Sequence, residues 1–381
     1  MISTPVTLSL PAGSVLVDDV DEELFLVYTR KLQLASSSGD DAAAGDTSAL
    51  GYLDSNDGVV HVALPVKPPP ASEKPASITG RRRRAAKSKV SESRELVVEV
   101  EVHQALDALR HRKGDTGSVL WRSSLHLAQY LLQSHHYPSP SSPPLFPSLA
   151  SSTVLELGSG TGFLGLALRS IWGDKGRWIF TDLLDNLPLV VRNLKANGVE
   201  SGSSAPSSGG QAGKATSRRP TAPSAQRPSA QVDVVELDWL VEAAAWDAHP
   251  GSLYLPSSPS SPARPLSSRS VSHAPSHPPS LILAADCVYN PSLSAPLAKT
   301  LLRHAGPDTL VLVACELRDE EPIDEFLRAW VTLGEGDGWT VARLGWGEEE
   351  RDGERARAQG IERGEFAVWV GWRASDEQGA T

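Results

Sequence analysis

The chain has 381 residues with a formal net charge of −10, which argues against nucleic-acid binding by the chain as a whole. Two cysteines, Cys287 and Cys315, are too few for a disulfide framework, and no Cys/His cluster has the spacing of a zinc site, so we expect a reducing compartment and no metal. No apolar run approaches a membrane span, and residues 1–17 lack the basic and apolar regions of a secretory signal, so we expect a cytoplasmic protein without a membrane partner.

The first 94 residues divide into two parts. Residues 1–35 form an N-terminal segment in which the periodicity predicts a helix over 19–34. Residues 36–94 are rich in Ala, Ser, Gly and Pro, and we expect disorder because such a composition buries little apolar surface. The basic run Arg81–Arg84 is interpreted as part of this solvated stretch, with a nuclear address or a ribosome-contacting patch as the alternatives.

Residues 95–375 form one domain, followed by a tail over 376–381. Ser/Pro-rich inserts interrupt this domain at about 201–230 and 249–279. A strand over 96–102 and a helix over 119–133 come first. Strands and helices then alternate, with strands at 153–158, 177–182, 232–239, 280–289 and 309–317, and helices at 163–171, 184–197, 292–304 and 320–333. Two strands, 339–346 and 365–372, end the domain. This order predicts an α/β, Rossmann-like sheet of seven strands, mostly parallel, with an antiparallel C-terminal edge.

Polar residues follow the predicted strands at their carboxyl ends, where open parallel sheets bind ligands. They are a turn with three glycines and the acidic residues Asp182, Asp238, Asp286 and Glu316. Packing alone does not explain so many polar groups at strand ends, so we expect one shared crevice. For Glu316 an ion pair with Arg318 is the structural alternative to a role as an acidic anchor.

The glycine turn has two possible ligands. Residues 160–165 match GxGxxG, which a dinucleotide site also shows. Glu156 stands two residues before Gly158, and this pattern favours S-adenosylmethionine (SAM), a sulfonium amino acid without phosphates. Asp182 is suited to accept the ribose hydroxyls in either case, or caps the following helix. Trp239 is placed to stack on an adenine, or is a rim aromatic of the core.

Three motifs resemble those of a known family. With these residues the chain resembles the seven-strand SAM-dependent methyltransferases, and more narrowly the protein-lysine methyltransferases with an Asp-x-x-Tyr motif after strand four. That motif is Asp286-Cys-Val-Tyr289; the entry motif is Gly117-Ser-Val-Leu-Trp121, and Val313–Arg318 resembles the family's strand-five motif. Asp21-Glu-Glu, Tyr28-Thr-Arg30 and Leu237-Asp-Trp239 make it most similar to the fungal ribosomal-protein lysine methyltransferases that act on the large-subunit stalk protein.

The resemblance implies SAM as cofactor and a basic ribosomal protein as the partner. It implies that Asp286 and Tyr289 handle the substrate lysine. Together with the glycine pattern, the predicted cofactor residues are Trp121, Glu156, Gly158, Ser159, Gly160, Gly162, Asp182, Trp239 and Ala285. Structural alternatives are a core or lid aromatic for Trp121 and a helix N-terminal packing residue for Tyr289.

Other functions stay open at this point. A small-molecule N-methyltransferase uses the same fold and would need a closed lid over its pocket. A non-catalytic SAM-binding or scaffold protein would use the inserts to recruit partners. A nicotinamide-dependent dehydrogenase is least favoured, because no second substrate domain is left once the inserts are removed.

Overall fold

The computed structural model describes residues 8–37, 57–68, 95–111, 116–139, 143–146, 148–173, 175–201, 231–254, 277–336, 338–345 and 365–373. The basic run Arg81–Arg84, the tail over 376–381 and most of the two predicted inserts lie outside these ranges, as does most of the predicted low-complexity segment. Within the described ranges, no helix combines the length and the apolar composition needed to cross a membrane.

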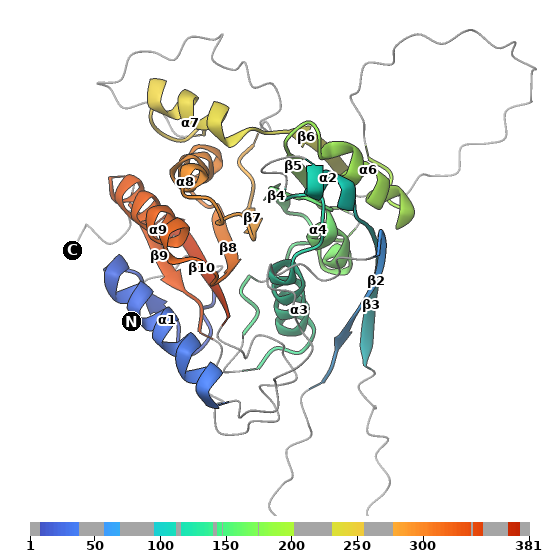
Figure 1. Cartoon of the computed structure of the whole chain (residues 1–381), viewed down its shortest axis with the longest axis horizontal. Coiled ribbons are helices and arrows are strands. Elements are labelled where there is room, and N and C mark those ends of the chain that lie inside the picture. The colour runs from blue at the N-terminus through green and yellow to red at the C-terminus, as the bar shows by residue number, and fades with distance from the viewer. Residues whose placement is uncertain are drawn as a thin grey trace, which may run out of the picture.

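A twisted sheet forms the centre of the described part of the molecule (Figure 1). Strands β8, β7, β4, β5 and β6 are parallel, and β10 lies antiparallel between β8 and β9. The predicted mostly parallel α/β sheet is therefore confirmed, with the short β1 added beyond β9. The strand order is β1 (Val15–Leu16), β9 (Trp339–Arg343), β10 (Phe366–Arg373), β8 (Leu310–Glu316), β7 (Leu281–Ala285), β4 (Thr153–Leu157), β5 (Arg177–Asp182) and β6 (Gln231–Glu236).

Helices cover both faces of the sheet, because its strands are apolar on both sides. In β5, Ile179 packs on one face, and Trp178 and Phe180 pack on the other. The first face carries α1 (Val20–Ser37), α7 (Trp239–Ala248), α8 (Pro291–His304) and α9 (Glu320–Glu335). The second carries α3 (Arg122–His136), α4 (Phe163–Ala167), α5 (Arg169–Trp172) and α6 (Leu187–Ala196). A short helix, α2 (Leu106–His111), precedes α3.

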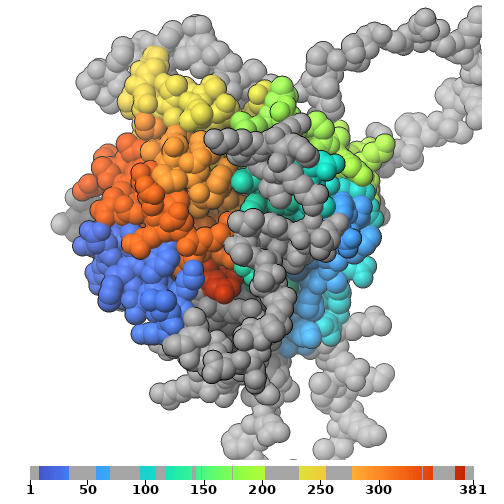
Figure 2. Space-filling view, viewed as in Figure 1, coloured from blue at the N-terminus to red at the C-terminus, as the bar shows by residue number. Residues whose placement is uncertain are grey.

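Helix α1 is held to the sheet by a buried carboxylate. Glu23 Oε1 accepts hydrogen bonds of 2.8 Å from Arg343 Nε of β9 and from Trp369 Nε1 of β10. At the other end of the helix, Lys31 Nζ donates to the carbonyl of Leu317, directly after β8. The space-filling view shows α1 packed beside the α8–α9 layer (Figure 2). The N-terminal helix thus reaches the strand end that carries Glu316 and Arg318.

A hairpin outside the main sheet differs from the sequence prediction. Strands β2 (Val59–Val66) and β3 (Leu96–His103) pair antiparallel along their length, so the assignment of 36–94 as low-complexity was wrong for 59–66. Val62, Leu64 and Val66 alternate into the core, a period-two pattern that the neighbouring proline-rich composition obscured. The predicted strand at 96–102 is confirmed as β3.

Two further predictions needed correction. Helix α7 was missed, and Trp239 is its first residue rather than the end of a strand. Asp238 caps this helix by accepting a 2.8 Å bond from the Leu240 N–H, and β6 ends at Glu236, three residues before the predicted end of the strand. The single helix predicted over 163–171 is two short helices, α4 and α5, that meet at Leu168.

Candidate active site

A cavity of about 470 Å³ lies where the chain order of the strands reverses, outside the carboxyl ends of β4, β5, β6 and β7. The glycine turn forms part of its wall, and the entry motif before α3 closes another side. Nine of the eleven predicted site residues line it: Trp121, Gly158, Ser159, Gly160, Asp182, Trp239, Ala285, Asp286 and Tyr289. The prediction of one shared crevice therefore holds for the glycine turn, Asp182, Asp238 and Asp286, whereas Glu316 does not line the cavity.

The glycine turn brings the backbone closer to its neighbours than a side chain would allow. Gly158 and Gly160 have φ of +60° and +55°. A Cβ on Gly158 would lie 2.8 Å from Cys287 Sγ, and one on Gly160 would lie 2.9 Å from the Gly117 carbonyl oxygen. Both positions therefore require glycine, for the backbone conformation and for the close approach.

Asp182 ends β5 with its carboxylate held by three donors. Oδ2 accepts a 2.7 Å bond from the Gly160 N–H, and Oδ1 accepts bonds from the Leu183 N–H and from Asn186 Nδ2 at 2.8 and 2.9 Å. All three donors are uncharged, so the carboxylate lines the cavity as a fixed acceptor. Asn186 was not among the predicted residues, and only its position four residues after Asp182 would have suggested it.

Glu156 and Gly162 do not line the cavity. Glu156 is buried on the α3–α4 face of β4, where Trp178 Nε1 donates a 2.8 Å bond to its Oε2. Burial raises the pKa of Glu156 to about 8, against the hydrogen bond from Trp178. Gly162 has φ of +74° and precedes the first turn of α4. Both support the glycine turn from behind.

Two tryptophans form the aromatic walls of the cavity. Trp239 lies over the glycine turn, since a Cβ on Gly158 would come within 3.1 Å of its ring. Trp121, the last residue before α3, donates from Nε1 to the Thr116 carbonyl at 2.7 Å. That bond and the start of the helix fix the indole against the carboxyl ends of the strands.

Asp286 follows β7 in a conformation that is unusual for a residue with a side chain. Its φ is +59°, and among the described residues Asp286 is the non-glycine residue with a positive φ. Its N–H donates to the Ala314 carbonyl at 2.8 Å, which ties the turn to β8. Strain of this kind is kept where the surrounding structure demands it. Tyr289 lies three residues on, half-buried, just before α8.

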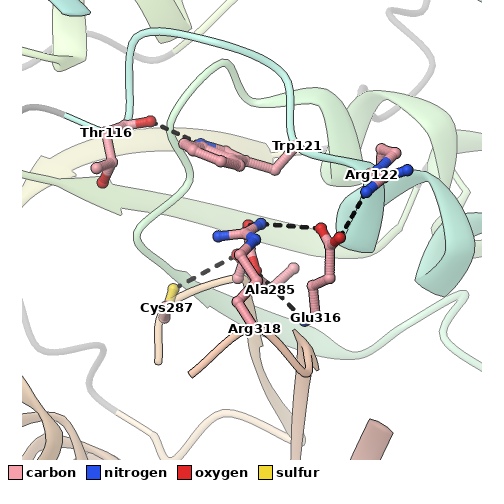
Figure 3. A network of polar contacts seen from close by, with 8 residues as sticks. Thr116, Trp121, Arg122, Ala285, Cys287, Glu316 and Arg318 are labelled. Atoms are coloured by element: carbon pink, nitrogen blue, oxygen red, sulfur yellow. Dashed lines mark hydrogen bonds and ion pairs between the residues drawn. The ribbon is translucent and has the colours of Figure 1, made fainter. Parts of the chain in front are cut away.

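The Asp286 carboxylate belongs to an ionic network. Figure 3 labels the other members of this network, Arg122, Glu316 and Arg318. Arg318 donates from one nitrogen to Asp286 Oδ2 at 2.5 Å and to Glu316 Oε2 at 3.0 Å. Arg122 of α3 pairs with the other oxygen of Glu316 at 2.5 Å. Burial raises the pKa of the Asp286 carboxyl, and the charge of Arg318 opposes that rise. Glu316 therefore has the ion pair with Arg318 that was the structural alternative for it.

The cavity is acidic. Among the described residues that line it are four aspartates, Asp182, Asp185, Asp238 and Asp286, and no Lys, Arg or His. Cys287 also lines it, and burial raises the pKa of this thiol well above its ordinary value, so it is neutral. Within the described ranges, no group of three or more His, Cys, Asp or Glu side chains is arranged to hold a metal ion. Such a lining suits a positively charged organic ligand.

These residues fit SAM as the cofactor. The volume lies within the roughly 300–1,000 Å³ of small-molecule pockets. Asp182 provides a fixed acceptor for ribose hydroxyls, and Trp239 provides an aromatic face for the adenine. The glycine turn offers backbone close to the ligand without a phosphate-binding lysine. The fold and the cavity together are those expected of a SAM-dependent methyltransferase.

The comparison with family models narrows this class. Residues 101–207 and 269–330 match the model of the lysine methyltransferase family. The matched residues include Trp121, the glycine turn, Asp182, Asp286 and Arg318. Trp239 and Asp238 lie between the two matched stretches.

More distant likenesses were also found. A Schizosaccharomyces pombe protein named diaminohydroxyphosphoribosylamino-pyrimidine deaminase is 26% identical over 231 residues, which cover 60% of this chain and 41% of that protein. The chain thus spans well under half of that relative. Among solved structures, the O-methyltransferase TomG from Streptomyces achromogenes in complex with SAM is 11% identical, with a TM-score of 0.34 and coverage of 72% of this chain and 92% of that one.

A Streptococcus mutans protein named as a SAM-dependent methyltransferase is 12% identical to this chain. Its TM-score is 0.35, and the likeness covers 72% of this chain and 53% of that one.

Proposed function

We propose that the protein is a SAM-dependent protein-lysine N-methyltransferase, and that its acceptor is a basic protein of the large ribosomal subunit. The carrying observation is the buried carboxylate of Asp286, held in a left-handed turn beside Trp121 and Tyr289 at the cavity. A fixed carboxylate beside aromatic faces is the chemistry that binds a lysine amine.

The cofactor would be held by the residues that line the inner part of the cavity. Asp182 would accept from the ribose, Trp239 would pack on the adenine, and the backbone at Gly158–Gly160 would approach the amino-acid end. When bound, SAM supplies an electrophilic methyl group on a positively charged sulfur. Its positive charge suits the acidic lining.

The chain's own residues would align and activate the acceptor. Lysine has a pKa near ~10.4, and only the neutral amine attacks. Asp286 would accept a hydrogen bond from the amine and aim its lone pair at the methyl carbon, with Tyr289 beside it. The N–C bond forms as the C–S bond breaks, the electron pair stays on sulfur, and the proton of the methylated ammonium leaves to water. Most of the rate would come from this alignment and from exclusion of water.

The acceptor class is supported by charge and by the motifs. The chain carries a net charge of −10, and four aspartates line the cavity, so a basic partner is favoured electrostatically. The motifs around Asp21, Tyr28 and Trp239 resemble those of the ribosomal-protein lysine methyltransferases. Because this acceptor is a ribosomal protein, we expect the protein to act in the cytoplasm.

Transfer of labelled methyl groups tests the proposal. The acceptor would be salt-washed ribosomes from cells lacking this protein, with mass spectrometry of the labelled product and calorimetry of SAM binding. Asp286→Asn should lower transfer by about 100-fold or more and leave SAM binding within about twofold, because the amide no longer orients the amine. Asp182→Ala should weaken SAM binding at least about tenfold, since it removes a charged acceptor.

A matched control changes an aspartate outside the cavity. Asp247 of α7 pairs with Lys299 on the surface, and Asp247→Asn should keep both transfer and SAM binding. Methyl-lysine in one large-subunit protein supports the proposal. Label confined to small molecules would favour the small-molecule N-methyltransferase, and SAM binding without any transfer would favour a non-catalytic SAM-binding protein.

A further inference from the structure

Arg318 occupies the place where a cation would be expected at this site. Its guanidinium carbon lies 4.6 Å from the centre of the Trp121 ring, and one of its nitrogens contacts Asp286 Oδ2. Figure 3 shows the guanidinium group between the indole and the end of β8. An aromatic face and a carboxylate are the two groups that bind an ammonium ion. The chain's own arginine therefore already satisfies both.

The charges of the network sum to zero. Asp286 and Glu316 contribute two carboxylates, and Arg122 and Arg318 contribute two guanidinium groups. Glu316 and Asp286 are both about 8% exposed, so water screens these charges weakly. Direct ion pairs join Arg318 to both carboxylates and Arg122 to Glu316.

Other titratable groups surround the network. Cys287 after β7 and Cys315 of β8 are buried thiols, and burial raises the pKa of each, so they add no charge. Asp182 lines the same cavity, and its negative charge contributes to the raised pKa of Cys287. On the outer side are His126 of α3, whose ring lies 4.2 Å from Phe366, Lys31 of α1 at the Leu317 carbonyl, and Glu365, whose backbone carbonyl accepts from Leu317.

We propose that Arg318 is a positioning residue that balances the charge around Asp286, so that the acceptor lysine binds as the neutral amine. The inference rests on the proposed function and adds how the site meets the need for a deprotonated nucleophile. An unbalanced carboxylate would favour the ammonium form of the lysine and raise its pKa. Arg318 removes that preference and leaves Asp286 able to accept a hydrogen bond from N–H. Its guanidinium stays charged at every working pH.

Three variants change the charge of the network and keep a polar side chain at each position. Arg318→Gln removes one positive charge and leaves the network at −1. Glu316→Gln removes one negative charge and leaves it at +1. The double variant R318Q/E316Q returns it to zero. A merely structural role for Arg318 would predict losses that add up in the double variant, whereas charge balance predicts recovery.

The measurement is the single-turnover rate of methyl transfer to salt-washed ribosomes as a function of pH. In R318Q the rising limb of the profile should move up by about one pH unit or more, because an opposite charge nearby raises the amine pKa by that much. At a fixed pH on that limb, the rate should fall about tenfold for each pH unit by which the limb moves. In E316Q the limb should move to lower pH, and in the double variant it should return to the wild-type position.

Controls separate this inference from the proposed function. Arg328→Gln removes a positive charge from the exposed face of α9 and should leave the profile unchanged. Calorimetry should give the same SAM affinity for all variants, which shows that they are folded. Coincident pH profiles for the wild type and R318Q would overturn the inference alone. A higher rate for R318Q at every pH would also overturn it, because Arg318 would then be blocking the site of the amine. Absence of label with the wild-type protein would instead overturn the proposed function.

Discussion

Asp182 is the last residue of β5 and Asp286 follows β7 in the same sheet, yet the groups around the two carboxylates differ. Asp182 is held by the N–H groups of Gly160 and Leu183 and by the amide of Asn186, all uncharged donors. Its carboxylate lines the cavity. Asp286 is balanced by Arg318 in an ion pair. One carboxylate is suited to a cationic ligand with hydroxyl donors, and the other to a neutral amine.

Glu156 gives a prediction at the same scale. Its pKa rises from an ordinary value of 4.5 to about 8 in the fold because the carboxyl group is buried. The folded protein thus keeps a proton on Glu156 between these values, and the unfolded chain does not. The contribution to stability is full below about pH 4.5 and is lost as pH rises to about 8, by at most ~1.4 kcal/mol per pH unit.

Glu156→Gln should remove this dependence. The amide oxygen still accepts from Trp178 Nε1, and the variant should become more stable than the wild type as pH approaches 8. Urea unfolding at several pH values measures the difference, with the exposed Glu22→Gln as the control. SAM affinity should stay within about twofold, since Glu156 does not line the cavity. Parallel stability curves for wild type and variant would contradict the argument.

At the scale of elements, amide side chains cover both edges of the hairpin. On the β3 edge, Asn193 of α6 accepts from the His103 N–H at 2.7 Å and donates to the His103 carbonyl at 3.0 Å, and Asn197 bonds Glu101 in the same way. On the β2 edge, Gln129 and Gln133 of α3 donate to backbone carbonyls. These amides satisfy backbone groups that an open strand edge leaves unpaired.

Asn193 also ties this hairpin to the glycine turn, because its amide donates to the Thr161 carbonyl at 2.8 Å. Asn193→Ala should destabilise the protein by roughly 2–4 kcal/mol, since it leaves buried backbone groups without partners. Hydrogen exchange should speed up at β3 and at the turn together. The matched substitution Asn290→Ala, at the exposed cap of α8, should leave β3 protected. Loss of protection confined to α6 would show that the amide does not couple these elements.

The same scale shows what the sequence could and could not predict. Continuous apolar strands such as 281–285 and 310–316 predicted the parallel sheet. The position of Asp286 directly after one of these strands predicted that it would lie at the site. Helix α7 was missed because the predicted strand ran on to Trp239, the first residue of the helix, and residues 240–248 were assigned to no element. Its anchor is a tertiary one: buried Glu242 accepts from Arg303 and His304 of α8.

Side-chain direction was the harder part at the site. The motif placed Glu156 near the cofactor, but the alternation of β4 turns it toward Trp178, on the opposite face from Leu155 and Leu157. The pairing of Arg122 with Glu316 joins residues far apart in the chain, and no local pattern announces it.

At the scale of the whole molecule, the acidic cavity opens on a chain whose net charge is −10. A basic acceptor would be attracted before contact, and salt would screen that attraction over about 10 Å at 0.1 M. The rate constant at low acceptor concentration, kcat/KM, reports on this encounter. The maximal rate, kcat, reports on steps inside the site, where Asp286 is shielded from the solvent.

Raising the salt concentration should therefore lower kcat/KM for a basic protein acceptor several-fold and change kcat little. The measurement is methyl transfer to the labelled ribosomal protein, purified, over about 0.05 to 0.5 M salt. SAM binding at each salt concentration is the control, because a small ligand inside the cavity is less affected. A kcat/KM that does not change with salt would mean that uncharged contacts, rather than charge, select the acceptor. A parallel fall in kcat would place the salt-sensitive step within the site itself.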